Sequence, residues 1–120
     1  MARPIRRASI LLAALLTAGA LAACGSGGPT DREQIGAIVK DEGTHPVTLC
    51  HHLADSLLVR FGGLGNCLSR AASASRDPST RATHVAVQGK TATAVVVDST
   101  GSRSITLVKQ KGSWLISGVR

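Results

Sequence analysis

The chain has 120 residues, 43% hydrophobic and 18% charged, a length that suits one small domain rather than two with separate cores. Only 2% of the residues are aromatic, which argues against proteins that stack nucleic-acid bases on aromatic side chains. The formal net charge of +7 falls to +4 without Arg3, Arg6 and Arg7, and this remainder is too scattered to indicate a nucleic-acid partner.

Residues 1–23 have the pattern of a secretory signal peptide. Three arginines precede an uncharged run, residues 8–23, in which alanine and leucine predominate. A membrane-spanning helix needs roughly 20 apolar residues, and this run is shorter and is closely followed by the glycine- and serine-rich residues 25–28. We therefore expect the segment to be removed during export rather than kept as a transmembrane helix.

The end of this run, Leu21-Ala22-Ala23-Cys24, resembles the lipobox of bacterial lipoproteins. The resemblance implies that the thiol of Cys24 receives a diacylglyceryl group and that cleavage makes this cysteine the first residue of the mature protein. Two acyl chains, such as palmitate, on one residue form a stable membrane anchor. The alternative is ordinary signal cleavage near Ala23, which leaves Cys24 as a free thiol.

This interpretation divides the chain into three parts. Residues 1–23 are the signal peptide, and residues 24–29 are a flexible tether because glycine and serine predominate in them. Residues 30–120 form the folded domain. We expect that domain to be lipid-anchored at the cell membrane, on its extracytoplasmic face.

Three cysteines in an exported chain leave one unpaired unless another reaction uses it. Lipidation would use Cys24 and leave Cys50 and Cys67. Because exported proteins fold in an oxidising compartment, we expect these two to form a disulfide.

A zinc site is the competing interpretation of Cys50, because His45, His51 and His52 are close to it in the sequence. Zinc sites commonly combine two pairs of ligands at short, regular spacings, and no second pair of this kind is present. Neighbouring His51 and His52 would also point in different directions on a helix. We therefore expect no metal and no other cofactor.

Helices are expected in the first half of the domain. Thr30 and Glu33 form a capping-box pattern, and Gly43 is a stop signal, so a first helix is predicted over about 31–42. Pro46 suits the first turn of a second helix. Apolar residues at helical spacing predict one continuous buried face on it, made by Cys50, Leu53, Ala54, Leu57, Leu58 and Phe61.

A short third helix is predicted after a glycine-rich break over 62–65. Asn66 is placed to cap it, and Cys67, Leu68 and Ala71 indicate its buried side. A polar connection follows over 73–80.

From Arg81 onward the apolar pattern changes to a period of two, and turn residues recur at regular intervals over 88–90, 98–102 and 110–113. This predicts four antiparallel strands in sequential order. The fold class is therefore α+β, with two or three N-terminal helices packed on a four-stranded sheet. Trp114 is expected to fill the space between helices and sheet, and His84 to face solvent.

The lipobox, the cysteine pair around a helical hairpin, and the closing strands 104–109 and 114–116 together resemble small bacterial lipoproteins of the NTF2-like superfamily. The resemblance covers most of residues 30–120. It implies a short version of the cone-shaped NTF2-like fold, in which helices and a curved sheet enclose a pocket. Enzymes of this superfamily place an aspartate or a histidine inside the cone as general acid or base.

His51 and Asp55 are the candidates for such chemistry, since they are four residues apart on the predicted second helix. They flank its apolar face, however, and no tyrosine is present to stabilise an oxyanion. The motifs of serine hydrolases, P-loop proteins and zinc proteases are also absent.

We therefore expect a noncatalytic domain that binds a small apolar ligand or another envelope protein. Two alternatives stay open. One is an NTF2-like cone enzyme of the lyase or isomerase type that uses His51 and Asp55. The other is a metal-handling envelope lipoprotein that uses the histidines.

Overall fold

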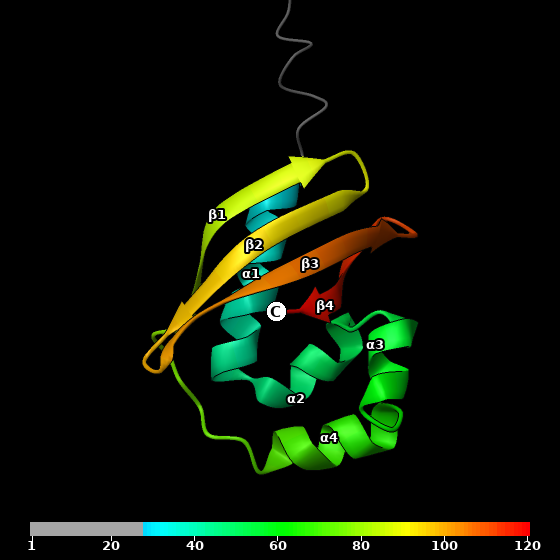
Figure 1. The fold of residues 1–120 in the computed structure, drawn as a ribbon, viewed down its shortest axis with the longest axis vertical. Coiled ribbons are helices and arrows are strands. Elements are labelled where there is room, and N and C mark those ends of the chain that lie inside the picture. The colour runs from blue at the N-terminus through cyan, green and yellow to red at the C-terminus, as the bar shows by residue number, and fades with distance from the viewer. Residues whose placement is uncertain (1–27) are drawn as a thin grey trace, which may run out of the picture.

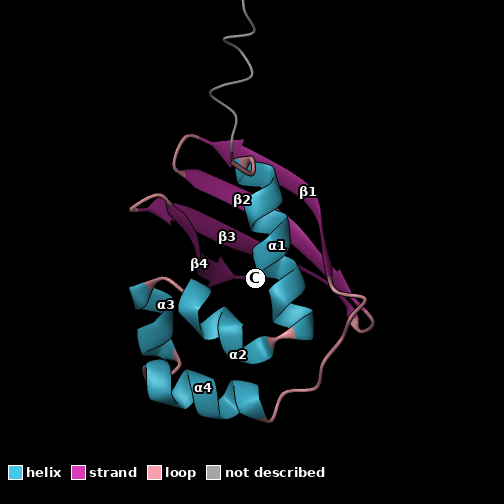
Figure 2. Ribbon diagram, turned by 180° about the vertical axis from the view of Figure 1, so that it is seen from behind, coloured by secondary structure: helices cyan, strands magenta, loops and turns pink. Residues whose placement is uncertain are grey.

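The computed structural model describes residues 28–120, which fold as helices packed against a four-stranded antiparallel sheet (Figure 1, Figure 2). The helical part contains α1 (Asp31–Thr44), α2 (Pro46–Leu49), the 3-10 turn η2 (Cys50–His52), α3 (Asp55–Arg60) and α4 (Leu64–Ala72). The sheet contains β1 (Arg81–Gln88), β2 (Thr91–Asp98), β3 (Gly101–Gln110) and β4 (Ser113–Val119). The predicted α+β class is confirmed. The lipobox and Cys24 lie outside the described residues.

Helix α1 begins as predicted and packs along β1 (Figure 2). The hydroxyl of Thr30 accepts a hydrogen bond from the Glu33 amide at 3.2 Å, which caps the first turn. Ile35, Ile38 and Val39 form the buried side of the helix. These three residues recur at the spacing of one helical face, so α1 covers the sheet with a single apolar stripe.

The sequence analysis predicted that Gly43 ends the first helix, and this prediction is wrong. The helix continues to Thr44, and Gly43 is buried against the loop that precedes β1. Its carbonyl accepts a hydrogen bond from the Asp77 amide at 2.8 Å, and a Cβ at this position would overlap the Asp77 carbonyl and the Thr80 side chain. The glycine therefore serves a close approach of two backbones rather than a helix stop.

The predicted continuous helix over 50–61 is wrong, because the chain becomes extended at Leu53 and Ala54. Leu53 forms a parallel bridge with Ile116, and the Ala54 amide donates a hydrogen bond to the Ile116 carbonyl at 2.8 Å. Strand β4 is an edge strand, and its free backbone groups form hydrogen bonds with this segment. Cys50, Leu53, Ala54 and Leu57 of the predicted face are still buried, whereas Leu58 and Phe61 are partly buried.

The strands pair in the sequential order β1-β2-β3-β4, as predicted. Side chains alternate between the two faces of the sheet. The face toward the helices carries the buried residues Ala92, Ala94, Val96, Ile105, Leu107, Trp114 and Ile116. Together with the apolar side of α1 they form one continuous core.

Trp114 fills the core, as expected, and is 1% exposed. Its indole Nε1 donates a hydrogen bond to the carboxylate of Asp31 at 2.9 Å, and Lys109 Nζ lies 2.8 Å from the same oxygen. The polar atom of a buried tryptophan needs such a partner. These contacts hold the first turn of α1 against β3 and β4.

Cys50 and Cys67 form the predicted disulfide, with their Cα atoms 5.9 Å apart. It joins η2 to α4, and Cys67 is the buried residue of α4. Gly63, rather than the predicted Asn66, occupies the N-cap position of α4. None of the helices within residues 28–120 has both the length and the apolar character needed to cross a bilayer.

Candidate binding cavity

A cavity of about 470 Å³ lies between the short helices and strands β3 and β4. Most of its wall is apolar, formed by Pro46, Leu49, Leu53, Leu57, Phe61, Ala71, Ala74, Ile105, Ile116 and Val119 together with the Cys50–Cys67 disulfide. Its floor is the core side of the sheet, where Ile105 and Ile116 are buried. Its rim includes Ala74 and Val119, which are exposed. The cavity is therefore reachable from solvent.

The short helices leave this space because each one changes direction after a few residues. The extended pair Leu53 and Ala54 separates η2 from α3, and Gly62 and Gly63, with φ of 83° and 93°, turn the chain from α3 into α4. Glycine adopts such positive φ values without steric cost. Helix α4 consequently packs on α2, η2 and α3, at the far end of the molecule from the β1–β2 turn (Figure 1).

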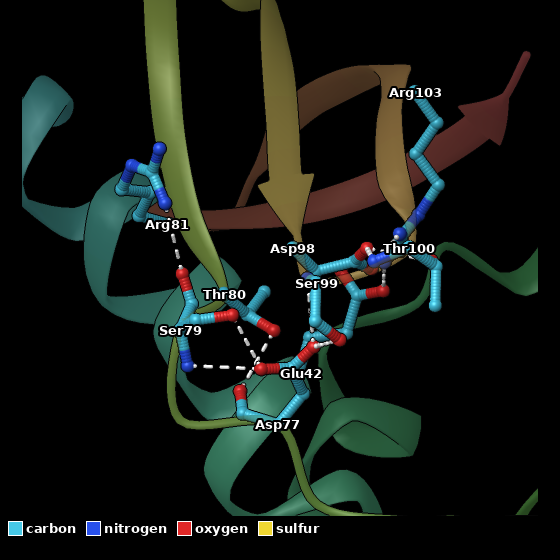
Figure 3. Close-up of polar contacts among 9 residues, drawn as sticks. All are labelled: Glu42, Asp77, Ser79, Thr80, Arg81, Asp98, Ser99, Thr100 and Arg103. Atoms are coloured by element: carbon cyan, nitrogen blue, oxygen red, sulfur yellow. Dashed lines mark hydrogen bonds and ion pairs between the residues drawn. The ribbon is translucent and has the colours of Figure 1, made fainter.

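One end of the cavity is charged and is organised around Arg103 of β3 (Figure 3). The guanidinium forms ion pairs with Glu42 of α1 and with Asp98 of β2, the latter at 2.7 Å. Asp98 also accepts hydrogen bonds from the amide and the hydroxyl of Thr100. These hydrogen bonds lower the pKa of Asp98, and the one from the Thr100 hydroxyl has the largest effect.

Asp77 lies at the same end of the cavity, in the loop between α4 and β1 (Figure 3). One carboxylate oxygen accepts hydrogen bonds from the amide and the hydroxyl of Ser79, and the other accepts both from Ser99. The Ser79 hydroxyl, followed by the Ser99 hydroxyl, holds the pKa of Asp77 well below its usual range. Asp77 therefore stays ionised near neutral pH and ties this loop to the β2–β3 turn.

The structure does not place His51 and Asp55 in the cavity. Both are exposed, and neither lines its wall. The extended residues Leu53 and Ala54 lie between them, so the predicted pairing of His51 and Asp55 on one helix is wrong.

The remaining histidines also lie apart from the cavity wall. His45 and His52 each approach Asp41, at 3.9 Å and 4.0 Å. Within residues 28–120 no group of three histidine, cysteine or acidic side chains is arranged to hold a metal ion. His84 is exposed at a bulge in β1, with φ of 51°.

No protein-family model, curated protein or solved structure matches this chain. The charged residues of the cavity were identified from the structure alone. The sequence analysis did not single out Glu42, Asp77, Asp98 or Arg103. They occur in turns and at helix or strand ends, where polar residues are ordinary. Asp77 and Asp98 carried a local signal, because an aspartate two residues before a serine or threonine often forms a turn of this kind.

Proposed function

We propose that this protein is a lipid-anchored envelope protein whose domain binds a small apolar ligand without catalysing a reaction. The observation that carries the proposal is the cavity beside β3 and β4, whose wall is mostly apolar. Its volume of about 470 Å³ lies in the range of small-molecule sites, which is roughly 300–1,000 Å³. Removal of an apolar ligand from water into such a wall provides the favourable free energy of binding.

The noncatalytic part of the proposal is supported by the state of the acids in the wall. General acid–base catalysis requires a group whose pKa lies near the working pH. Asp77 and Asp98 have lowered pKa values and already accept hydrogen bonds from neighbouring serine and threonine groups. Glu42 is paired with Arg103. These contacts serve the structure of the site, and the lowered pKa values of Asp77 and Asp98 favour their ionised forms.

The lipid anchor is supported by the lipobox and by the short distance from Cys24 to the domain. Helix α1 begins at Asp31, seven positions after Cys24, the expected first residue of the mature chain. Seven residues span at most about 25 Å. An anchor at Cys24 would hold the domain close to the membrane surface.

A short NTF2-like arrangement is the fold we propose for residues 30–120. The order of the elements supports it, because helices precede an antiparallel meander in the chain. A cavity lies between these two layers, as the cone of that superfamily would require. The α+β class by itself does not depend on this proposal.

The test is binding of a neutral fluorescent probe, N-phenyl-1-naphthylamine, to the full chain. Ala71 lines the cavity, whereas its neighbour Ala72 is exposed and does not. We expect Ala71→Phe to fill the cavity and weaken binding about tenfold, and the matched variant Ala72→Phe to bind like the wild type. Comparable thermal unfolding of the two variants controls for folding. Equal binding by both variants, or no saturable binding, would refute the proposal.

A further inference from the structure

We infer that the cavity takes an anionic amphiphile, namely one aliphatic chain that ends in a carboxylate or phosphate, and that Arg70 binds the head group. This rests on the proposed function, because it names the ligand class of the same cavity.

The wall is suited to an aliphatic chain. Phe61 is the aromatic residue in it, and Trp114 lies elsewhere, 1% exposed in the core. The other apolar residues of the wall are aliphatic apart from the disulfide, and such side chains pack closely around a hydrocarbon chain. The volume of about 470 Å³ is near the lower end of the usual range for ligand sites and therefore suits a single chain.

The charged residues in the wall determine which head group the cavity accepts. Arg103 is neutralised by Glu42 and Asp98, and Asp77 uses both carboxylate oxygens on Ser79 and Ser99. A cationic head group would have to compete with these contacts.

Arg70 differs from the other charged residues of the wall. Among residues 28–120 it forms no ion pair, and its guanidinium donates no hydrogen bond. It lies in the last turn of α4, exposed, and it lines the cavity. A guanidinium binds carboxylate and phosphate groups through two parallel hydrogen bonds. An aliphatic chain inside the cavity would therefore place its anionic end at Arg70.

The test is displacement of the bound probe N-phenyl-1-naphthylamine from the full chain by amphiphiles of one chain length, below their critical micelle concentrations. Decanoate and decyl phosphate carry the two anionic head groups, decanol is neutral, and decylammonium is cationic. An exposed ion pair contributes a modest free energy, so we expect the anions to displace the probe at concentrations about fivefold lower than decanol. Arg70→Gln should remove this difference without changing displacement by decanol.

Arg60→Gln is the matched control, since Arg60 is also an exposed arginine in the last turn of its helix but does not line the cavity. It should keep the preference for anions. A preference for decanoate alone would indicate a fatty acid, and one for decyl phosphate alone a phosphorylated lipid, both within the inferred class.

Equal displacement by anions and decanol, or strongest displacement by decylammonium, would overturn the inference and leave apolar binding intact. If the anion preference survived in Arg70→Gln, Arg70 would not be the head-group site. Absence of probe binding to the wild type would overturn both this inference and the proposed function.

Discussion

At the level of single residues, the polar end of the cavity depends on Asp77. Its carboxylate accepts hydrogen bonds from Ser79 on one side and from Ser99 on the other, and so joins two loops that are distant in the chain. Each of these hydrogen bonds favours the charged carboxylate over the protonated form. The stability that Asp77 contributes is therefore coupled to pH.

The sign of this coupling follows from the lowered pKa of Asp77. A carboxyl whose pKa is depressed on folding stabilises the protein above its unfolded pKa, about 3.9, and this contribution is lost as the pH falls toward the folded pKa. We expect the midpoint of thermal unfolding to fall below about pH 4 in the wild type. Asp77→Asn should lower the midpoint at pH 7 and show a smaller further decrease in acid.

Asp55→Asn is the control for this experiment, because the carboxylate of Asp55 accepts no hydrogen bond from the residues that the structure describes. It should leave the acid dependence of the midpoint as in the wild type. An Asp77→Asn protein with the wild-type acid dependence would contradict the assigned role.

Gly43 and Gly36 both lie in α1 and provide a matched pair of substitutions. A Cβ at Gly43 would overlap the Asp77 carbonyl and Thr80, whereas a Cβ at Gly36 would meet nothing within 4 Å. We expect Gly43→Ala to lower the free energy of unfolding by about 1–3 kcal/mol. Gly36→Ala should raise it by about 0.5–1 kcal/mol, since alanine favours the helix. Denaturant unfolding measures both, and a neutral Gly43→Ala would show that the loop does not pack as described.

At the level of the elements, α4 is held in the fold by its contacts with other helices. It packs on α2, η2 and α3 rather than on the sheet, and its buried residue is the disulfide-bonded Cys67. Because α4 also forms one wall of the cavity, through Arg70 and Ala71, the disulfide holds the cavity together as well as the chain.

The double variant Cys50→Ala, Cys67→Ala tests this role of the disulfide. The two cysteines are 17 residues apart, and closing a loop of this size stabilises a protein by about 3 kcal/mol. We expect hydrogen exchange to show lost protection of the α4 amides while the amides of β2 and β3 stay protected. Binding of the apolar probe should be lost in the same variant. Uniform loss of protection across the domain would instead indicate that α4 and the sheet unfold together.

At the level of the whole molecule, α1 separates the start of the domain from the cavity. The chain enters α1 at Asp31, and Glu42 and Gly43, near its other end, line the cavity. With a rise of 1.5 Å per residue, the 14 residues of α1 span about 20 Å. Figure 1 shows α4 at the end of the molecule away from the start of α1. In an anchored protein this arrangement puts the cavity at the end away from the tether.

The anchor is tested by Cys24→Ala. We expect the wild type to partition with membranes and to yield a mature N-terminal peptide carrying a lipidated cysteine by mass spectrometry. Because the acyl chains supply the membrane affinity, the variant should be released or should accumulate as the uncleaved precursor. An unmodified Cys24 in the mature wild-type protein would refute the anchor.

Local patterns in the sequence determined most of the elements. The alternation of β-branched residues from Arg81 onward predicted four strands in the order observed, because strand pairing by short turns depends on residues that are close in the chain. The Thr30 cap was predicted from its spacing to Glu33, and the burial of Trp114 from its position at the start of a strand. The disulfide followed from the cysteine count, since only Cys50 and Cys67 remained once Cys24 was assigned to the lipid.

Only the tertiary structure decided the break at Leu53 and Ala54 and the charged end of the cavity. The break requires the free edge of β4 at Ile116, and an apolar helical period carries no information about a hydrogen-bond partner that distant in the chain. Likewise Arg103 of β3 reaches Glu42 of α1 only because the tertiary fold brings these distant parts of the chain together. Periodicity reports which residues face the core, whereas the site depends on which elements meet there.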